Sequence, residues 1–308
     1  MTTLTNMIDE VTMNLSGYTL QQDRATYITA AVTTTTSPSS GPTILTLASA
    51  DNLGKGVIEI DEELLWIDNF DRVGNTATIA PYGRGYLGTT AATHAADAKV
   101  TISPTFPRFA IKRAINDTIN AVGSTIFAAS TTTITSNAAV SAFRVPTTGA
   151  TLNIRSILAI AYQALGASKE WIPIRSWRLD LNANTTAFTS GQTVSIYDVI
   201  PSGRTVQIVY SYDPVIFATN ADVFTTQTGL PESCKDLIIL GATYRLLSNL
   251  DPARASMISP QADEVDAKRP YGSSQSITKQ IYALFNQRLN EEIKSQQEKY
   301  PIRIHYSL

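Results

Sequence analysis

Apolar residues recur at helical spacing in four stretches of the chain. Between residues 3 and 16 they follow one another at steps of three and four, at Leu4, Met7, Ile8, Val11 and Leu15. Steps of this kind place side chains on one face of a helix. The same spacing predicts helices over 107–126, 232–250 and 273–299, the last with apolar positions Ile277, Ile281, Leu284, Phe285, Leu289 and Ile293.

Short apolar segments separated by turn residues fill the region between the first two predicted helices. The candidate strands are 43–48, 56–60, 63–68, 75–80 and 98–103. Strands this short and this closely spaced are typical of a small antiparallel barrel or sandwich. The stretch before them, up to Pro42, is rich in Thr, Ser and Pro, which is typical of a linker.

A second and larger β region is predicted between about 131 and 226, with its clearest strands at 170–181, 193–199 and 204–212. If the strand at 170–181 runs unbroken, Trp171 and Trp177 share one of its faces. The segment 152–166 fits either a strand or a buried helix. Its β-branched start and its flanking Thr and Gly residues favour a strand.

These elements together predict an α+β fold. In it, the N-terminal, middle and C-terminal helices pack as one helical core, and two antiparallel β modules are inserted between them. The first module is small and barrel-like, and the second is larger and sandwich-like. The predicted domains are an N-terminal helix and linker at 1–42, a small β-barrel-like insertion at 43–104, a core helix at 105–130, a larger β-sandwich-like insertion at 131–230, and a C-terminal helical region with an extended tail at 231–308.

Composition narrows the classes of function. Threonine, a β-branched residue suited to sheets, occurs 40 times, and 38 of these lie in residues 1–230. Charged residues make up 16% of the chain and the formal net charge is -2, so the basic surplus of a nucleic-acid-binding protein is absent. No apolar run approaches about 18 residues, so we expect no membrane partner. The single cysteine, Cys234, excludes an internal disulfide and a multi-cysteine zinc site.

The side chains able to carry acid–base catalysis are few. His94 has no GxSxG nucleophile motif to serve, and we expect it to pack or hydrogen-bond locally in a loop. Asp61, Glu62 and Glu63 resemble the paired carboxylates of a glycosidase, but they fall where a hairpin must turn. A solvated turn is the favoured interpretation of these three acids.

One acidic stretch comes close to a calcium-binding loop. Asp68, Asn69, Asp71 and Asn75 offer oxygen ligands, but the closing Glu of such a loop is missing. The sequence therefore predicts no metal site, no cofactor and no enzymatic activity.

The most specific stretch of the sequence is PYGRGYLGTTAATHAADAKVTIS, at 81–103. Its glycines permit positive φ in a tight loop, and the small residues that follow can pack closely against a neighbour. We predict a structural loop that closes the small β module. The residues that we expect to define it are Arg84, Gly85, Gly88, Thr89 and His94.

This stretch resembles a recurring signature of tailed-bacteriophage structural proteins. The signature is carried by Arg84, Gly85, Gly88, Thr89, Ala91, His94 and Val100, and Asp97 stands where family members often have glycine. The segments DLIILGATYRLLSNLDPARA and EEIKSQQEKYPIRIHYSL are similar to the C-terminal part of phage neck proteins, which are also called head-to-tail adaptors, connectors or head-completion proteins.

The resemblance implies a virion structural protein rather than an enzyme. Such adaptors sit below the portal protein, usually as a twelve-fold ring of identical subunits, and extend the DNA channel toward the tail. The implied partners are further copies of the chain, the portal protein and a downstream neck or tail protein. DNA passes through the lumen without sequence-specific binding. The implied location is the neck of the virion, which is assembled in the host cytoplasm.

The C-terminal tail alternates apolar and polar residues after Pro301, which is the period of a half-buried strand. It either packs back on its own subunit or docks on a neighbouring subunit or the portal, and the resemblance favours docking. The docking residues would be Tyr300, Pro301, Ile302, Arg303, Ile304, His305 and Tyr306.

An alternative function is a phage tail-associated glycan-binding module or hydrolase. In this interpretation exposed aromatic side chains stack on sugar rings, and the candidates are Trp171, Trp177, Tyr210 and Tyr212.

Overall fold

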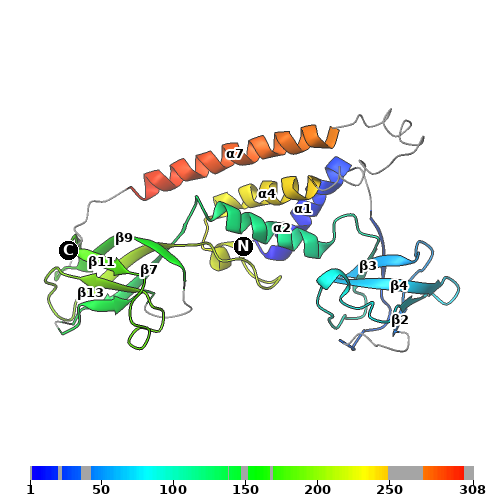
Figure 1. Ribbon diagram of the computed structural model, residues 1–308, viewed down its shortest axis with the longest axis horizontal. Coiled ribbons are helices and arrows are strands. Elements are labelled where there is room, and N and C mark those ends of the chain that lie inside the picture. The colour runs from blue at the N-terminus through cyan, green and yellow to red at the C-terminus, as the bar shows by residue number, and fades with distance from the viewer. Residues whose placement is uncertain are drawn as a thin grey trace. The chain divides into compact units, whose positions relative to one another are not determined.

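The computed structural model is a mixed fold of helices and antiparallel sheets, and its elements are shown in Figure 1. The structure describes residues 2–19, 23–35, 43–137, 139–146, 152–166, 169–248 and 273–301. It divides into two compact units. Unit 1 comprises Met1–Leu4, Asn116–Ile238 and Tyr282–Leu308, and unit 2 comprises Thr5–Ile115 and Ile239–Ile281.

The predicted helical core is wrong as a description of this fold. Helices form about 30% of the chain, and the structure is sheet-rich. The boundary between the two units passes through all four of the predicted core helices, so these helices do not form a separate body. The physical reason lies in the threonine content, because β-branched residues favour a pleated surface over a helix. The predicted domain boundaries stay a prediction.

Unit 2 is built on a six-stranded antiparallel sheet that curls into a half-barrel. A bridge between Ile28 and Leu47 joins the ends of its two edge strands. The strand at Arg24–Tyr27 was not predicted from the sequence. In spatial order the strands are β1 (Arg24–Tyr27), β6 (Lys99–Ile102), β3 (Gly56–Ile60), β4 (Glu63–Asp71), β5 (Thr76–Ile79) and β2 (Thr43–Thr46). Their inward side chains, among them Ile58, Ile60, Leu65, Ile67 and Val100, form one apolar core.

Unit 1 contains a four-stranded and a three-stranded antiparallel sheet that share one apolar core. The first sheet has the order β10 (Trp171–Pro173), β9 (Ile154–Gln163), β13 (Thr205–Tyr212) and β7 (Ala128–Thr135). The second has the order β11 (Trp177–Asp180), β12 (Thr193–Ile196) and β8 (Ala142–Arg144). The strand interpretation of 152–166 is therefore confirmed by β9.

The predicted strand at 170–181 is broken into β10 and β11, which belong to different sheets. The break follows Pro173, which cannot donate a ladder hydrogen bond, and the N–H groups of Arg175 and Ser176 instead donate to the Asp198 carboxylate. Trp171 and Trp177 therefore do not share a face of one strand. Trp171 is 43% exposed and Trp177 is 7% exposed.

The helices of the described ranges are α1 (Leu4–Thr19), α2 (Arg108–Val122), α3 (Phe224–Thr228), α4 (Lys235–Leu247) and α7 (Ser273–Lys299), with 3₁₀ turns η1 (Tyr86–Gly88) and η2 (Glu232–Cys234). All five predicted apolar positions of α1 are buried. In α7, Ile281 and Phe285 are buried, but Leu284 is 45% exposed, so its predicted place in the apolar stripe is wrong. None of the described helices combines the length and the hydropathy needed to span a bilayer.

Candidate functional site

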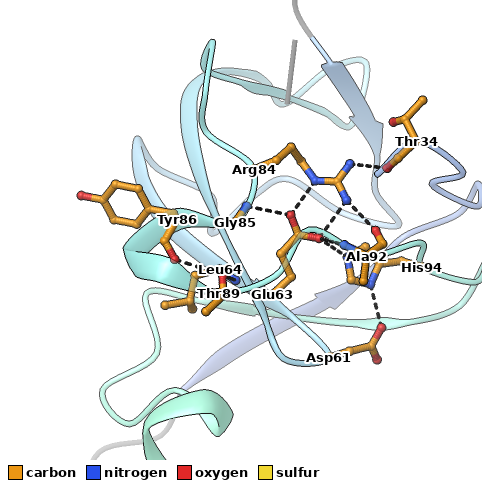
Figure 2. A network of polar contacts seen from close by, with 10 residues as sticks. All are labelled: Thr34, Asp61, Glu63, Leu64, Arg84, Gly85, Tyr86, Thr89, Ala92 and His94. Atoms are coloured by element: carbon orange, nitrogen blue, oxygen red, sulfur yellow. Dashed lines mark hydrogen bonds and ion pairs between the residues drawn. The ribbon is translucent and has the colours of Figure 1, made fainter. Parts of the chain in front are cut away.

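The candidate site is a group of buried polar side chains where the loop after β5 meets the start of β4. Figure 2 shows its members pointing toward one another from separate turns of unit 2. We call Asp61, Glu63, Arg84 and His94 the Glu63 cluster. Asp61 comes from the turn between β3 and β4, Glu63 is the first residue of β4, and Arg84 and His94 come from the loop 81–98 between β5 and β6.

The Glu63 carboxylate is the centre of this cluster. One oxygen, Oε1, accepts hydrogen bonds from Arg84 Nε at 2.6 Å and from the Gly85 backbone N–H at 3.0 Å. The other, Oε2, lies 2.8 Å from Arg84 Nη2, 2.9 Å from the Ala92 backbone N–H and 2.9 Å from His94 Nε2. Both side chains of the Glu63–Arg84 pair are fully buried. A buried charge needs this degree of pairing to be tolerated.

Arg84 uses its planar group to join three segments of unit 2. Besides the bidentate contact with Glu63, its Nη1 donates to the Thr34 carbonyl at 2.8 Å and its Nη2 donates to the Ala92 carbonyl at 2.5 Å. Both carbonyls lie outside strands and would otherwise lack a ladder partner there. The fork geometry of a guanidinium suits this role, and a lysine could not reproduce it.

His94 connects the cluster to the segment that follows β1. Its backbone exchanges two hydrogen bonds with Val32, at 2.8 and 2.9 Å. Its side chain is fully buried, with Nδ1 2.7 Å from Asp61 Oδ2 and Nε2 2.9 Å from Glu63 Oε2. An imidazole between two carboxylates donates from both nitrogens when it is protonated.

The electrostatics of the cluster favour its charged forms. Burial acts to raise the pKa of Glu63, but hydrogen bonds from Arg84, His94 and two backbone N–H groups outweigh it and lower the pKa to about 2. Burial acts to lower the pKa of His94, and the two carboxylates outweigh it and raise the pKa. Both shifts favour the charged form of the group, a carboxylate at Glu63 and an imidazolium at His94, because each stabilises the other.

The glycine loop is shaped to bring these side chains together. Gly85 has φ of +61°, and a Cβ there would lie 2.7 Å from the Thr89 carbonyl oxygen. Gly88 has φ of +83° with open space around it. Thr89 closes the loop, because its hydroxyl accepts from the Leu64 N–H at 3.0 Å and donates to the Tyr86 carbonyl at 3.0 Å. Of the five predicted loop residues, Arg84, Gly85, Thr89 and His94 meet around β4, while Gly88 acts through its backbone.

The interpretation of Asp61, Glu62 and Glu63 as one solvated turn is wrong for Glu63. The Asp61 side chain is 61% exposed and that of Glu62 is 26% exposed, whereas that of Glu63 is fully buried. A signal was present in the sequence, because side chains two residues apart in a strand point to the same face of the sheet. Glu63 therefore shares a face with Leu65 and Ile67, which are buried.

Glu59 is a further buried acid that the sequence reasoning missed. It is 4% exposed and accepts a hydrogen bond from the Arg108 backbone N–H at 2.5 Å, at the first residue of α2. Burial raises the pKa of Glu59 to about 7, against the opposing effect of Arg108. The carboxylate satisfies one of the helix N–H groups that have no partner within the helix.

The oxygen-bearing residues at the end of β4 and in the following turn make turn contacts. Asp71 Oδ1 accepts from the Val73 N–H at 2.9 Å, and Asn75 Oδ1 accepts from the Ala50 N–H at 3.0 Å. Within the residues that the structure describes, no group of three or more His, Cys, Asp or Glu side chains is arranged to hold a metal ion.

Of the predicted docking residues, the structure describes Tyr300 and Pro301, and 302–306 lie outside the described ranges. The Tyr300 ring lies 5.8 Å from that of Phe127, centroid to centroid, in unit 1. Of the four aromatic residues proposed for glycan stacking, Trp177, Tyr210 and Tyr212 are buried and only Trp171 is substantially exposed.

Comparison with known proteins adds no relative to this picture. No protein-family model matches the chain, and no curated protein matches it. The likeness to phage neck proteins therefore rests on the motif residues alone.

Proposed function

We propose that the chain is a virion structural protein, a head-to-tail adaptor in the neck of a tailed bacteriophage. It forms a ring with copies of itself, twelve-fold by the resemblance, below the portal protein. The ring extends the DNA channel to a downstream neck or tail protein. The subunits are assembled in the host cytoplasm, and the protein has no catalytic activity.

One observation supports a structural role more than any other: the polar side chains of the specific motif face inward. Arg84 and His94 are fully buried, and their contacts are with Glu63, Asp61 and backbone carbonyls of the same unit. A catalytic or ligand-binding site presents such groups to a cleft instead. Here these buried side chains hold the loop in one conformation. A module that takes part in an assembly needs a loop of fixed shape.

The charge of the chain fits a DNA conduit. Each phosphate contact by Lys or Arg adds salt-sensitive affinity for DNA. With 24 basic and 26 acidic residues, the chain has no surplus with which to retain DNA that must slide past it.

The glycan-binding alternative has no observation in its favour. It depended on several aromatic side chains exposed on one surface, and three of the four are in or beside the core of unit 1.

The test is the mass and shape of the purified protein with and without the portal protein of the same phage. Light scattering after size exclusion and negative-stain electron microscopy are expected to show ring-sized particles, and portal alone is the control. A chain that stays monomeric in both samples contradicts the proposal. Binding of the monomer to a glycan array favours the alternative.

A further inference from the structure

Glu59 lies on the outer face of the curled sheet, on the side away from the apolar core of unit 2. Its neighbours in β3, Ile58 and Ile60, belong to that core, and successive side chains of a strand point to opposite faces. β3 is a central strand, in which Glu59 stands opposite Thr101 of β6 and Leu64 of β4. Glu59 is nevertheless only 4% exposed, so this part of the outer face is covered.

The first turn of α2 lies against this buried side chain. The Arg108 backbone N–H donates to Glu59 Oε1 at 2.5 Å, and the Phe109 N–H also donates to the carboxyl group. The N–H groups at the start of a helix have no carbonyl partner within the helix. Arg108–Ile115 belongs to the same compact unit as β3. One carboxyl group therefore joins a central strand to the start of a helix 49 residues further along the chain.

The charged side chains of the elements around this contact come from both signs. They are Asp9 of α1, Asp23 before β1, Glu62 of the turn between β3 and β4, Lys99 of β6, and Arg108 and Lys112 of α2. Both cations of α2 are paired with other acids: Arg108 Nη1 lies 2.6 Å from Asp9 Oδ1, and Lys112 Nζ lies 3.1 Å from Glu62 Oε2. Lys99 is exposed to solvent. The charge of an ionised Glu59 is therefore compensated only in part.

The protonation equilibrium of Glu59 follows from this environment. Burial raises the pKa of Glu59 to about 7, against the opposing effects of Arg108 and the Phe109 N–H, and the charge of Asp23 raises it further. An exposed glutamate has a pKa of about 4.3. The closed contact therefore holds its proton more tightly than an open one does. Its stability is fully present below about pH 4.3 and is lost as pH rises through 7.

We propose that Glu59 is a pH-sensitive switch: its neutral carboxyl group holds the first turn of α2 against β3, and ionisation of that group lets the turn open. The neutral group keeps a carbonyl oxygen that accepts a helix N–H, and it leaves no charge in the interior. The ionised group is a stronger acceptor, but its charge is fully solvated only when the contact opens. The switch lies within unit 2, so the inference does not rest on the adaptor function.

The first test is hydrogen exchange of the unaltered chain, measured by mass spectrometry on peptides that cover 103–112. Each exchange rate is divided by the intrinsic rate at the same pH. The protection of these peptides is expected to fall at least tenfold between pH 4.5 and 6.5. A fall that begins only above about pH 6.5 overturns the proposal, because His94 titrates in that range. Protection that does not change with pH overturns it as well.

The second test is Glu59→Gln, in which an amide keeps the shape of the carboxyl group but does not titrate. The protection of 103–112 is expected to become independent of pH between 4.5 and 6.5. Glu62→Gln is the matched control, because it removes the partner of Lys112 on the same helix, and it is expected to keep the full pH dependence. A tenfold fall that persists in Glu59→Gln overturns the proposal. If Glu59→Gln does not fold, the profile of the unaltered chain decides alone.

Discussion

Glu63 accepts five hydrogen bonds, from the side chains of Arg84 and His94 and from two backbone N–H groups. The number of these donors determines how much stability is lost when the carboxylate is removed. Arg84 supplies two of the five, His94 one, and backbone N–H groups the remaining two. The Arg84 and His94 side chains are fully buried, so water cannot replace Glu63 as the acceptor of their hydrogen bonds. The carboxylate is therefore needed to keep the cations in the interior.

Replacing Glu63 by Gln is expected to destabilise the protein by about 3–5 kcal/mol, since it leaves the buried Arg84 guanidinium without its carboxylate partner. Glu62→Gln is the matched control: this neighbour makes a single ion pair, with Lys112 at 3.1 Å, and its loss is expected to destabilise the protein less than the loss of Glu63. Urea unfolding followed by circular dichroism measures both. Equal effects of the two substitutions would contradict the central role of Glu63.

The stability of the cluster is expected to fall at both extremes of pH. The pKa of Glu63 is lowered to about 2 on folding, so its contribution is present above the unfolded value of about 4.3 and is lost as pH falls toward 2. The pKa of His94 is raised, so its contribution is present below about 6.5 and is lost as pH rises through the folded value.

The free energy of unfolding measured from pH 2 to 9 tests this expectation. In His94→Gln the free energy of unfolding should no longer show the decline that His94 causes above about pH 6.5. The loss of stability at acid pH, which Glu63 causes, should remain. Persistence of the same alkaline decline in the variant would assign it to another group.

At the scale of an element, the glycine loop depends on two positions for different reasons. Gly85 combines a positive φ with a close approach to the Thr89 carbonyl, and Gly88 has only the positive φ. Gly85→Ala is expected to lower stability by more than the roughly 1–2 kcal/mol of a left-handed alanine, and Gly88→Ala by about that amount. Thermal unfolding measures the loss of stability in each variant. A larger loss for Gly88→Ala than for Gly85→Ala would mean that the loop backbone relaxes freely at Gly85.

The exposed and buried faces of α7 make a second comparison within one element. Phe285 is 7% exposed and its neighbour Leu284 is 45% exposed. Phe285→Ala is expected to cost about 3–5 kcal/mol because it leaves a cavity, and Leu284→Ala less than about 1 kcal/mol because surface changes have small effects. Chemical denaturation measures the free energy of unfolding of both variants. A large loss of stability in Leu284→Ala would show that this face of α7 is covered in solution.

At the scale of the whole molecule, each compact unit has its own apolar core. One core belongs to the curled sheet of unit 2, and the other joins the two sheets of unit 1. We expect Glu63→Gln to increase hydrogen exchange in β3, β4 and β6 while β9 and β13 keep their protection. Exchange that rises equally in both groups of strands would show that the two units open as one.

The sequence by itself determined the elements with the clearest local period. The helix at 3–16 and the helix at 273–299 follow from apolar spacing, and the structure confirms both. The strand at 56–60 and the strand interpretation of 152–166 also follow from local residue patterns, and the structure confirms both. Hydrophobic period is local information, and neighbouring residues are enough to set it.

The tertiary structure alone decided the contacts made over long sequence separations. Glu63 meets Arg84 and His94 across 21 and 31 residues, and only the curled sheet brings them together. The same is true of the break at Pro173, which depends on Asp198, and of the sheet-centred organisation that replaced the predicted helical core. Burial of a polar side chain is not a property of its own segment, because it depends on which distant groups complete its hydrogen bonds.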